Sequence, residues 1–233
     1  LSRMEQLHGK PLSYNNLNDL TAARGLAAEL ERPACVIVKH ANPCGAAVAA
    51  SAEAAYAKAL ACDPVSAYGG VVALTGPVSA ALGETLAAQF VEVLLAPGFD
   101  EQALEALVAK PGTRILADHE RRALEGDGVD LRRVPGGLLA QDHDEGTVRR
   151  EEMRVVCGEV AENVWADIVF AWLVAKHTAS NAIVLAKEGM TIGIGSGQTS
   201  RVDAVRLALD KARAHVHDPA GAVLASDGFF PFA

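Results

Sequence analysis

A short apolar run that stops at two basic residues places the strongest constraint on how this chain can fold. Residues 34–38 (ACVIV) are all small or apolar and predict a buried β-strand. The strand leads into residues 39–45 (KHANPCG), whose proline and glycine predict a shaped turn. In open α/β sheets, ligands gather at the edge where strands end. The pattern therefore predicts that Lys39 and His40 reach a ligand-binding edge, and the plainer alternative is a solvated loop.

Composition limits the class of protein. The chain has 233 residues, half of them apolar but only 5% aromatic, so we expect a core of Ala, Val, Leu and Ile. This length suits two domains of roughly 100–150 residues each. The net charge of −8 argues against a nucleic-acid-binding protein that relies on a basic face. No apolar stretch reaches the roughly 18 residues of a membrane span, so we expect neither nucleic acid nor membrane as a partner.

The cysteines and the chain ends add two expectations. Four isolated cysteines without a C-x-x-C pair predict reduced thiols, most of them buried, and a cytoplasmic location. The sequence begins without methionine and stops just after an apolar motif. We therefore expect a fragment of a longer protein.

Short apolar runs alternate with helical patterns along the rest of the chain, which is typical of an α/β fold. We expect strands near residues 71–74, 113–117, 182–186, 190–194 and 222–226, and helices near residues 18–30, 51–62, 100–109, 164–178 and 201–214. The arginine pairs between residues 121 and 150 lie among acidic residues, which favours solvated loops. Charge and glycine content place a boundary near residues 145–158, which divides the chain into subdomains 1–150 and 151–233.

Two segments carry polar groups suited to a binding site. Tyr68 and Gly69 follow one another in a loop where glycine lets the backbone approach a ligand and tyrosine offers an aromatic face. Glu92 stands in the apolar run 91–96. A carboxylate there is either paired or used, unless it lies exposed on an edge strand.

Three other patterns each suggest a role from the local sequence alone. The amide-rich residues 13–19 predict Asx-turns and a helix N-cap. The apolar stripe that includes Trp172 indicates core packing without a functional role. The alternate glycines at 193, 195 and 197 precede a helix and expose N–H groups suited to an anion, although their spacing departs from the dinucleotide-binding pattern.

Five segments in unbroken order resemble the AICAR formyltransferase domain of the bifunctional purine-biosynthesis enzymes that also carry an IMP cyclohydrolase domain. They are residues 12–16 (LSYNN), 39–45 (KHANPCG), 66–70 (SAYGG), 180–184 with 192–203 (SNAIV and IGIGSGQTSRVD), and 226–232 (SDGFFPF). Each segment is weak alone, but five in order from end to end are specific.

The resemblance implies a fold, a reaction and an assembly. The implied fold is a duplicated three-layer α/β/α architecture with mixed sheets, like that of cytidine deaminases. The implied reaction transfers the formyl group of 10-formyltetrahydrofolate to the 5-amino group of the ribonucleotide AICAR and gives FAICAR, a step of IMP biosynthesis. A cytoplasmic homodimer with active sites built across the interface is implied as well.

The resemblance also assigns roles to residues. By position in the family motifs, His40 is the proton acceptor and Lys39 the transition-state stabiliser. The nucleotide contacts fall at Gly69, Glu92, Asn181, Arg201 and Phe229, with Tyr68 beside them on the same loop, and Val202 falls at a folate contact. A potassium site near Thr178, Ser180 and Asp227 is raised too, but we count no metal ligand among the site residues.

The chemistry fits these side chains. An aromatic-type amine is a poor nucleophile, so a base must take its proton as it attacks the formyl carbon, and histidine titrates near working pH. The oxyanion that forms needs a fixed positive donor, which a lysine at a strand end can provide. Because neighbouring strand residues point to opposite sides, we expect the proline–glycine turn to swing both side chains into one cleft.

The sequence departs from the family pattern in places. The 233 residues do not include the Arg-Tyr-Gly segment with which the family holds the nucleotide phosphate, the part that follows the Phe-Pro-Phe motif, or the cyclohydrolase domain. The resemblance also implies alanine where this sequence has Gly228. Two alternatives stay open. A zinc nucleoside deaminase would need H-x-E and P-C-x-x-C, but Asn42 and Ala47 occupy the decisive positions. The other alternative is a fragment that binds nucleotide or self-associates without turnover.

Overall fold

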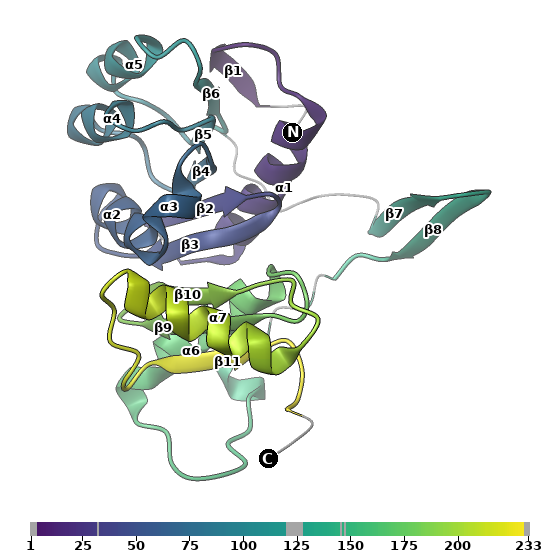
Figure 1. The fold of residues 1–233 in the computed structure, drawn as a ribbon. Coiled ribbons are helices and arrows are strands. Elements are labelled where there is room, and N and C mark those ends of the chain that lie inside the picture. Colours follow the sequence, from purple (N-terminus) through teal and green to yellow (C-terminus); the bar gives the residue numbers. More distant parts are fainter. Residues whose placement is uncertain (1–3, 32, 120–127, 145, 147, 231–233) are drawn as a thin grey trace.

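One mixed β-sheet of nine strands runs through the whole molecule, with helices on both of its faces (Figure 1). The computed structural model describes residues 4–31, 33–119, 128–144, 146 and 148–230. The strand order is β1-β6-β5-β4-β2-β3-β10-β9-β11, in which β4, β5 and β6 are parallel neighbours and the other pairs are antiparallel. The sheet strands are β1 (Glu5–His8), β2 (Ala34–Lys39), β3 (Asn42–Val48), β4 (Val71–Leu74), β5 (Val93–Ala96), β6 (Arg114–Ala117), β9 (Ile183–Lys187), β10 (Met190–Gly195) and β11 (Val223–Ser226).

The helices form the two outer layers. They are α1 (Tyr14–Glu29), α2 (Ala52–Cys62), α3 (Pro64–Ala67), α4 (Ala80–Ala87), α5 (Glu101–Val108), α6 (Trp165–Lys176) and α7 (Arg201–Ala214). Helices α1 and α6 share a core with one set of alternating strand residues, such as Val36 and Val184. Helices α2, α4, α5 and α7 pack on the opposite set, such as Ile37 and Ile183. The predicted three-layer α/β/α class is confirmed, and its core is built from small aliphatic residues as expected.

The two halves of the sheet repeat one topology. The order α1-β2-β3-α2-β4 recurs as α6-β9-β10-α7-β11, and in both units the first strand pairs antiparallel with the other two. The units meet where β3 and β10 pair antiparallel. The duplication predicted from the resemblance is therefore visible in the strand pairing. Because the junction is antiparallel, the turns of the two hairpins lie at opposite edges of the sheet, that is, at opposite ends of its strands.

Glycine lets the second strand of each hairpin pack tightly on the following helix. A Cβ on Gly45 in β3 would lie 1.9 Å from the carbonyl oxygen of Ala59 in α2. A Cβ on Gly195 in β10 would lie 2.0 Å from that of Ala204 in α7. A Cβ at either distance would overlap the carbonyl oxygen, so both positions need glycine for packing rather than for turn formation. Gly193 is held in the same way, so the predicted role of this glycine run in anion binding is wrong for the two glycines inside the strand.

Several segments differ from expectation. The region assigned to charged loops contains a second, two-stranded sheet of β7 (Val129–Val134) and β8 (Gly137–Asp142), which projects from the body (Figure 1). Arg121 and Arg122 fall outside the described residues. Helix α1 begins at Tyr14, earlier than predicted, because Ser13 caps it. The side chain of Trp172 is 43% exposed, so its assignment to the core was wrong.

Other expectations on the chain as a whole can be compared with the structure. Cys35, Cys44 and Cys62 are buried free thiols, whereas Cys157 is exposed. Among the described residues, no helix is both long and apolar enough to span a membrane. The predicted boundary near residues 145–158 falls between β8 and α6. Strands from both sides of it join one sheet, and the division into subdomains stays a prediction.

Candidate active site

The Lys-His motif forms the turn of the β2–β3 hairpin. Lys39 pairs with Asn42, which leaves His40 and Ala41 as a two-residue turn with φ of 52° and 59°. Positive φ at both positions is the geometry of a type I′ turn, and it costs of order 1 kcal/mol for each residue that is not glycine. The proline and glycine of the motif lie inside β3 instead of shaping the turn. The expected proline–glycine turn is therefore wrong, and His40 is itself the first residue of the hairpin turn.

Lys39 is fixed by the loop that precedes β4. Its Nζ donates hydrogen bonds to the carbonyl oxygens of Tyr68, at 3.0 Å, and Gly69, at 2.7 Å. Gly69 has φ of 65°, and a Cβ there would lie 3.3 Å from the Lys39 Nζ and 3.0 Å from the ring of Phe90. The glycine thus serves both the loop conformation and the close approach of the lysine. An ammonium group has three N–H donors, so one remains for a ligand.

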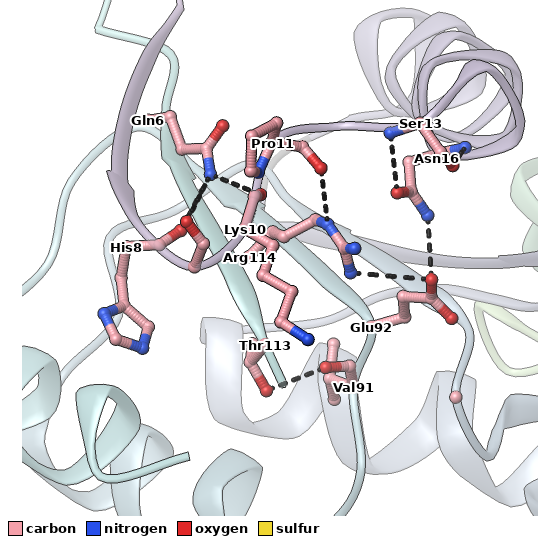
Figure 2. A network of polar contacts seen from close by, with 12 residues as sticks. Gln6, His8, Lys10, Pro11, Ser13, Asn16, Val91, Glu92, Thr113 and Arg114 are labelled. Atoms are coloured by element: carbon pink, nitrogen blue, oxygen red, sulfur yellow. Dashed lines mark hydrogen bonds and ion pairs between the residues drawn. The ribbon is translucent and has the colours of Figure 1, made fainter. Parts of the chain in front are cut away.

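Helix α1 brings polar groups to the same edge of the sheet. Ser13 and Asn16 form a reciprocal capping box, which confirms the predicted N-cap. Asn16 also donates from Nδ2 to Glu92 Oε1 at 2.9 Å, and Arg114 lies 3.5 Å from the same oxygen (Figure 2). Glu92 precedes β5, an internal strand, so the edge-strand alternative is wrong. Its carboxylate is paired, yet one oxygen has no partner among the described residues.

These groups surround a cavity of about 180 Å³ at the edge of the sheet. Its lining includes Lys39 and His40 of the hairpin, Asn16 and Asp19 of α1, and Gly69 and Glu92 of the loops before β4 and β5. The imidazole-bearing residue His40 is exposed to solvent, while Lys39 is half-buried. Four of the sequence-predicted site residues are thereby brought together in one place.

A second cluster from the other half of the chain lies at the same edge. Asn181 Nδ2 donates to the carbonyl of Gln198 at 2.8 Å. Arg201, at the start of α7, donates from Nη1 to Ser226 Oγ at 2.9 Å and forms an ion pair with Asp227. Asp227 also accepts hydrogen bonds from the Ser180 hydroxyl and from the backbone N–H of Ala182. This network joins the loops before β9, before α7 and after β11.

Asn42 connects the two clusters. Its Oδ1 accepts from the backbone N–H of Ala179 at 2.9 Å, and its Nδ2 donates to the carbonyl of His40 at 3.1 Å. Asn181 and Arg201 do not line the cavity that contains His40. The bridge through Asn42 nevertheless places the loop of Ala179 and Asn181 beside His40.

Three predicted site residues project into solvent. Tyr68 is 68% exposed and its ring lies 5.6 Å from that of Phe90, measured between centroids. Phe229 is 85% exposed, and Val202 is exposed on the first turn of α7. Exposed apolar side chains are surfaces on which a ligand or another chain can pack.

Gly228 lies against the guanidinium of Arg201. A Cβ at this position would come within 2.7 Å of Arg201 Nη2. The glycine therefore lets the guanidinium lie close to the backbone that carries Asp227. An alanine here would require the arginine side chain to shift.

Asp227 makes this cluster sensitive to acid. Partial burial acts against ionisation, but the hydrogen bonds from Ser180 and Arg201 outweigh it and lower the pKa of Asp227 from 3.8 to about 2. A folded-state pKa below the unfolded one stabilises the fold above the unfolded pKa, and this contribution is lost as the pH falls towards the folded pKa. The window for the loss is therefore from about pH 4 down to about pH 2.

We predict that Asp227→Asn lowers the thermal unfolding midpoint at pH 6 and that the difference from the unmodified chain shrinks through this window. Differential scanning fluorimetry between pH 6 and pH 2.5 measures the difference directly. Comparing the two proteins at each pH removes the contributions of Glu29 and Asp63, whose pKa values are lowered by their own partners despite burial. A difference that stays constant over the whole range would contradict the assignment.

Cys44 lies beside the Lys-His turn, but its surroundings do not favour a reactive thiolate. Burial, together with the nearby Cys62 and Asp63, raises the pKa of Cys44 to about 12. Its thiol donates to the carbonyl of Ile37 at 3.5 Å. A thiol held in this protonated state is a poor nucleophile at neutral pH. Nor does the described part of the chain gather three or more His, Cys, Asp or Glu side chains around a point that could hold a metal ion.

Sequence reasoning missed several residues that build the site. Asn16 was assigned to helix capping alone, and Asp19, Asn42 and Gln198 were given no role. The one available signal was that Asn16, Asn42 and Gln198 belong to three of the five matching segments. Their partners lie up to 137 residues away along the chain, which no local pattern reveals.

Comparison with known proteins identifies one family and several similar proteins. Residues 1–211 match a family described as the AICARFT/IMPCHase bienzyme. The chain is 47% identical over 237 residues to the "Bifunctional purine biosynthesis protein PurH" of Anaeromyxobacter dehalogenans (strain 2CP-C), an alignment that covers 97% of this chain and 44% of that protein. It is 46% identical over 240 residues to the protein of the same name from Cereibacter sphaeroides (strain ATCC 17029 / ATH 2.4.9), covering 98% and 45%. The chain thus spans less than half the length of these relatives.

Proposed function

The chain belongs to the AICARFT/IMPCHase bienzyme family, and we propose that it forms the part of such an enzyme that transfers a formyl group from 10-formyltetrahydrofolate to the 5-amino group of AICAR. The product would be FAICAR, in the biosynthesis of IMP. The observation that carries this proposal is that Lys39 and His40 line one cavity together with Glu92 and Gly69.

In the proposed reaction, His40 and Lys39 divide the work. The amine nitrogen of AICAR attacks the formyl carbon, a C–N bond forms, and the carbonyl electron pair moves to oxygen. His40 accepts the proton that the amine loses. The free N–H of the Lys39 ammonium, whose other two donors are held by Tyr68 and Gly69, stabilises the oxyanion. When the tetrahedral intermediate collapses, N10 of tetrahydrofolate leaves and takes up a proton.

The remaining site residues would bind the two substrates. Glu92 keeps a carboxylate oxygen without a partner among the described residues, which suits it to accept hydrogen bonds from an amide or hydroxyl group of AICAR. Arg201 and Asn181 would contact the nucleotide from the second cluster, together with the loop of Tyr68 and Gly69. Phe229 would pack on it, and Val202 would contact the folate.

A potassium ion near Thr178, Ser180 and Asp227 does not fit the residues as they lie. The carboxylate of Asp227 is already neutralised by Arg201 and hydrogen-bonded by Ser180. The Thr178 hydroxyl donates to the carbonyl of Val174 at 2.7 Å. We therefore derive no step through such an ion.

We further propose a cytoplasmic homodimer with shared sites. Two features support the shared arrangement. Arg201 and Asn181 do not line the cavity of His40 in the same chain, and the exposed Phe229 and Tyr68 offer apolar surface to a second copy. Light scattering of the full-length parent at micromolar concentration checks it, and a monomer would refute shared sites.

An assay of the full-length parent beside this 233-residue chain tests the reaction. We expect the parent to convert AICAR and 10-formyltetrahydrofolate to FAICAR and tetrahydrofolate. If the chain binds AICAR in calorimetry without turnover while the parent is active, the alternative of a non-catalytic fragment holds for the chain alone. Absence of formyl transfer by the parent would refute the proposal, and zinc-dependent release of ammonia from a nucleoside would instead indicate a deaminase.

A further inference from the structure

We propose that Asp19 is a positioning residue for the reaction, because it holds the His40–Ala41 turn in the conformation that presents the imidazole to the cavity. The inference rests on the proposed role of His40. Its direct observation is a hydrogen bond of 2.7 Å from the backbone N–H of Ala41 to Asp19 Oδ1. No feature of the sequence motif itself would indicate this contact, since the two residues are 22 positions apart.

The turn requires such support. Both of its residues adopt positive φ without being glycine, a conformation that persists only when the surroundings enforce it. A hydrogen bond to the N–H of the second turn residue opposes relaxation of both backbone angles. Since His40 lies in the turn itself, relaxation would move its imidazole away from the cavity.

Asp19 can enforce the turn because its own position is rigid. Helix α1 is capped at Ser13 and is tied to the loop before β5 by the hydrogen bond from Asn16 to Glu92. Leu20, the next residue along, is fully buried in the core between α1 and the sheet. A carboxylate on this helix therefore has little freedom to follow a turn that moves.

The second half of the chain uses the same device without a histidine. The turn of the β9–β10 hairpin consists of Glu188 and Gly189, with φ of 54° and 71°. Asp167 of α6 accepts hydrogen bonds from both backbone N–H groups, at 2.8 Å and 2.7 Å. Helix and hairpin occupy equivalent places in the repeat, so a carboxylate that clamps the turn occurs twice. Because the second turn lies at the opposite edge of the sheet, the repeat also supplies a matched control.

The kinetic test uses four variants of the full-length parent. We expect Asp19→Ala to lower kcat about 10- to 100-fold, the range expected for a displaced catalytic group, with the KM for AICAR nearly unchanged. Asp19→Asn keeps an acceptor oxygen and should retain most of the activity. Ala41→Gly removes the steric cost of positive φ, so adding it to Asp19→Ala should restore part of kcat. Asp167→Ala should leave kcat unchanged.

The outcomes that would overturn the inference are distinct. Unchanged kcat in Asp19→Ala would remove the positioning role. A large rise in KM, with no recovery in Asp19→Asn or in the Ala41→Gly double variant, would show that Asp19 contacts the substrate instead. If Asp19→Ala fails to fold, a kcat of Asp19→Asn lower than about a tenth of the unmodified value would also contradict the role, because this variant preserves the hydrogen bond.

A second readout separates this inference from the proposed function. In this chain, Asp19→Ala should accelerate hydrogen exchange of the Ala41 amide and shift the NMR signals of the His40 ring, whereas Asp167→Ala should accelerate exchange at Glu188 and Gly189 and leave Ala41 unaffected. Unaltered exchange at Ala41 would overturn the clamp whatever the activity. If exchange responds as expected but the unmodified parent transfers no formyl group, the clamp stands and the proposed reaction fails.

Discussion

His40→Asn in the full-length parent is expected to reduce kcat by about 10²–10⁴-fold, the usual contribution of a positioned general base. Asparagine is chosen because it tolerates positive φ better than alanine, and His40 has φ of 52°. The turn therefore keeps its backbone conformation while the proton acceptor is removed. AICAR binding should weaken by less than about tenfold, because the other residues proposed to contact the nucleotide lie on separate loops. Steady-state kinetics with isothermal titration calorimetry measures both quantities.

The equivalent turn supplies the control for this experiment. Glu188→Asn changes the residue in the same position of the β9–β10 turn, at the other edge of the sheet. It should leave kcat within about twofold, since residues that touch neither substrate nor site rarely affect it. Near-normal turnover in His40→Asn would refute the base assignment. Lost AICAR binding with unchanged chemistry would turn the Lys-His pair into a binding element.

Lys39→Met is expected to reduce kcat by about 10²–10³-fold, as removal of an oxyanion donor does in other enzymes. Methionine retains much of the apolar stem but cannot donate to the oxyanion. It also cannot donate to the carbonyls of Tyr68 and Gly69, which lie 3.0 and 2.7 Å from Nζ. We therefore expect the KM for AICAR to rise as well, because the loop that carries these carbonyls loses its anchor.

Lys187→Met is the matched control for the lysine. Lys187 ends β9 as Lys39 ends β2, and its Nζ donates to a single backbone carbonyl, that of Ala220, at 2.9 Å. This variant should lose some stability and keep its kcat. If Lys39→Met changed KM alone, Lys39 would be a support for the loop and the oxyanion would have another donor. Measuring kcat and KM separately for both substrates decides between these results.

Local sequence patterns were sufficient for most of the secondary structure. Residues 34–38 form the predicted buried strand because every side chain there is small or apolar on both faces. Helix α2 begins after its predicted cap, Ser51, whose side chain accepts from the N–H of Ala54. In these cases the deciding interactions lie within a few residues, so the order of residues contains the answer. The motif order likewise indicated the family that the comparisons support.

Sequence patterns failed where the deciding neighbour belongs to another strand or helix. Residues 129–142 contain two arginines and few strong strand formers, yet they pair as β7 and β8. The glycines of β10 looked like an anion loop, but the carbonyls of α7 leave no room for a side chain there. In both cases the prediction considered the composition of one segment and not the strand or helix that packs against it.

The sequence by itself determined the small-residue core, the alternation of strands and helices, and the two side chains most suited to the chemistry. The tertiary structure alone decided how these side chains are held. The Asn16–Glu92 contact joins residues 76 positions apart, and the Asn42–Ala179 contact joins residues 137 apart. Contacts of this kind depend on which strands become neighbours in the sheet. Strand order follows from the burial of whole helix and sheet faces, a property of the assembled layers that no single segment contains.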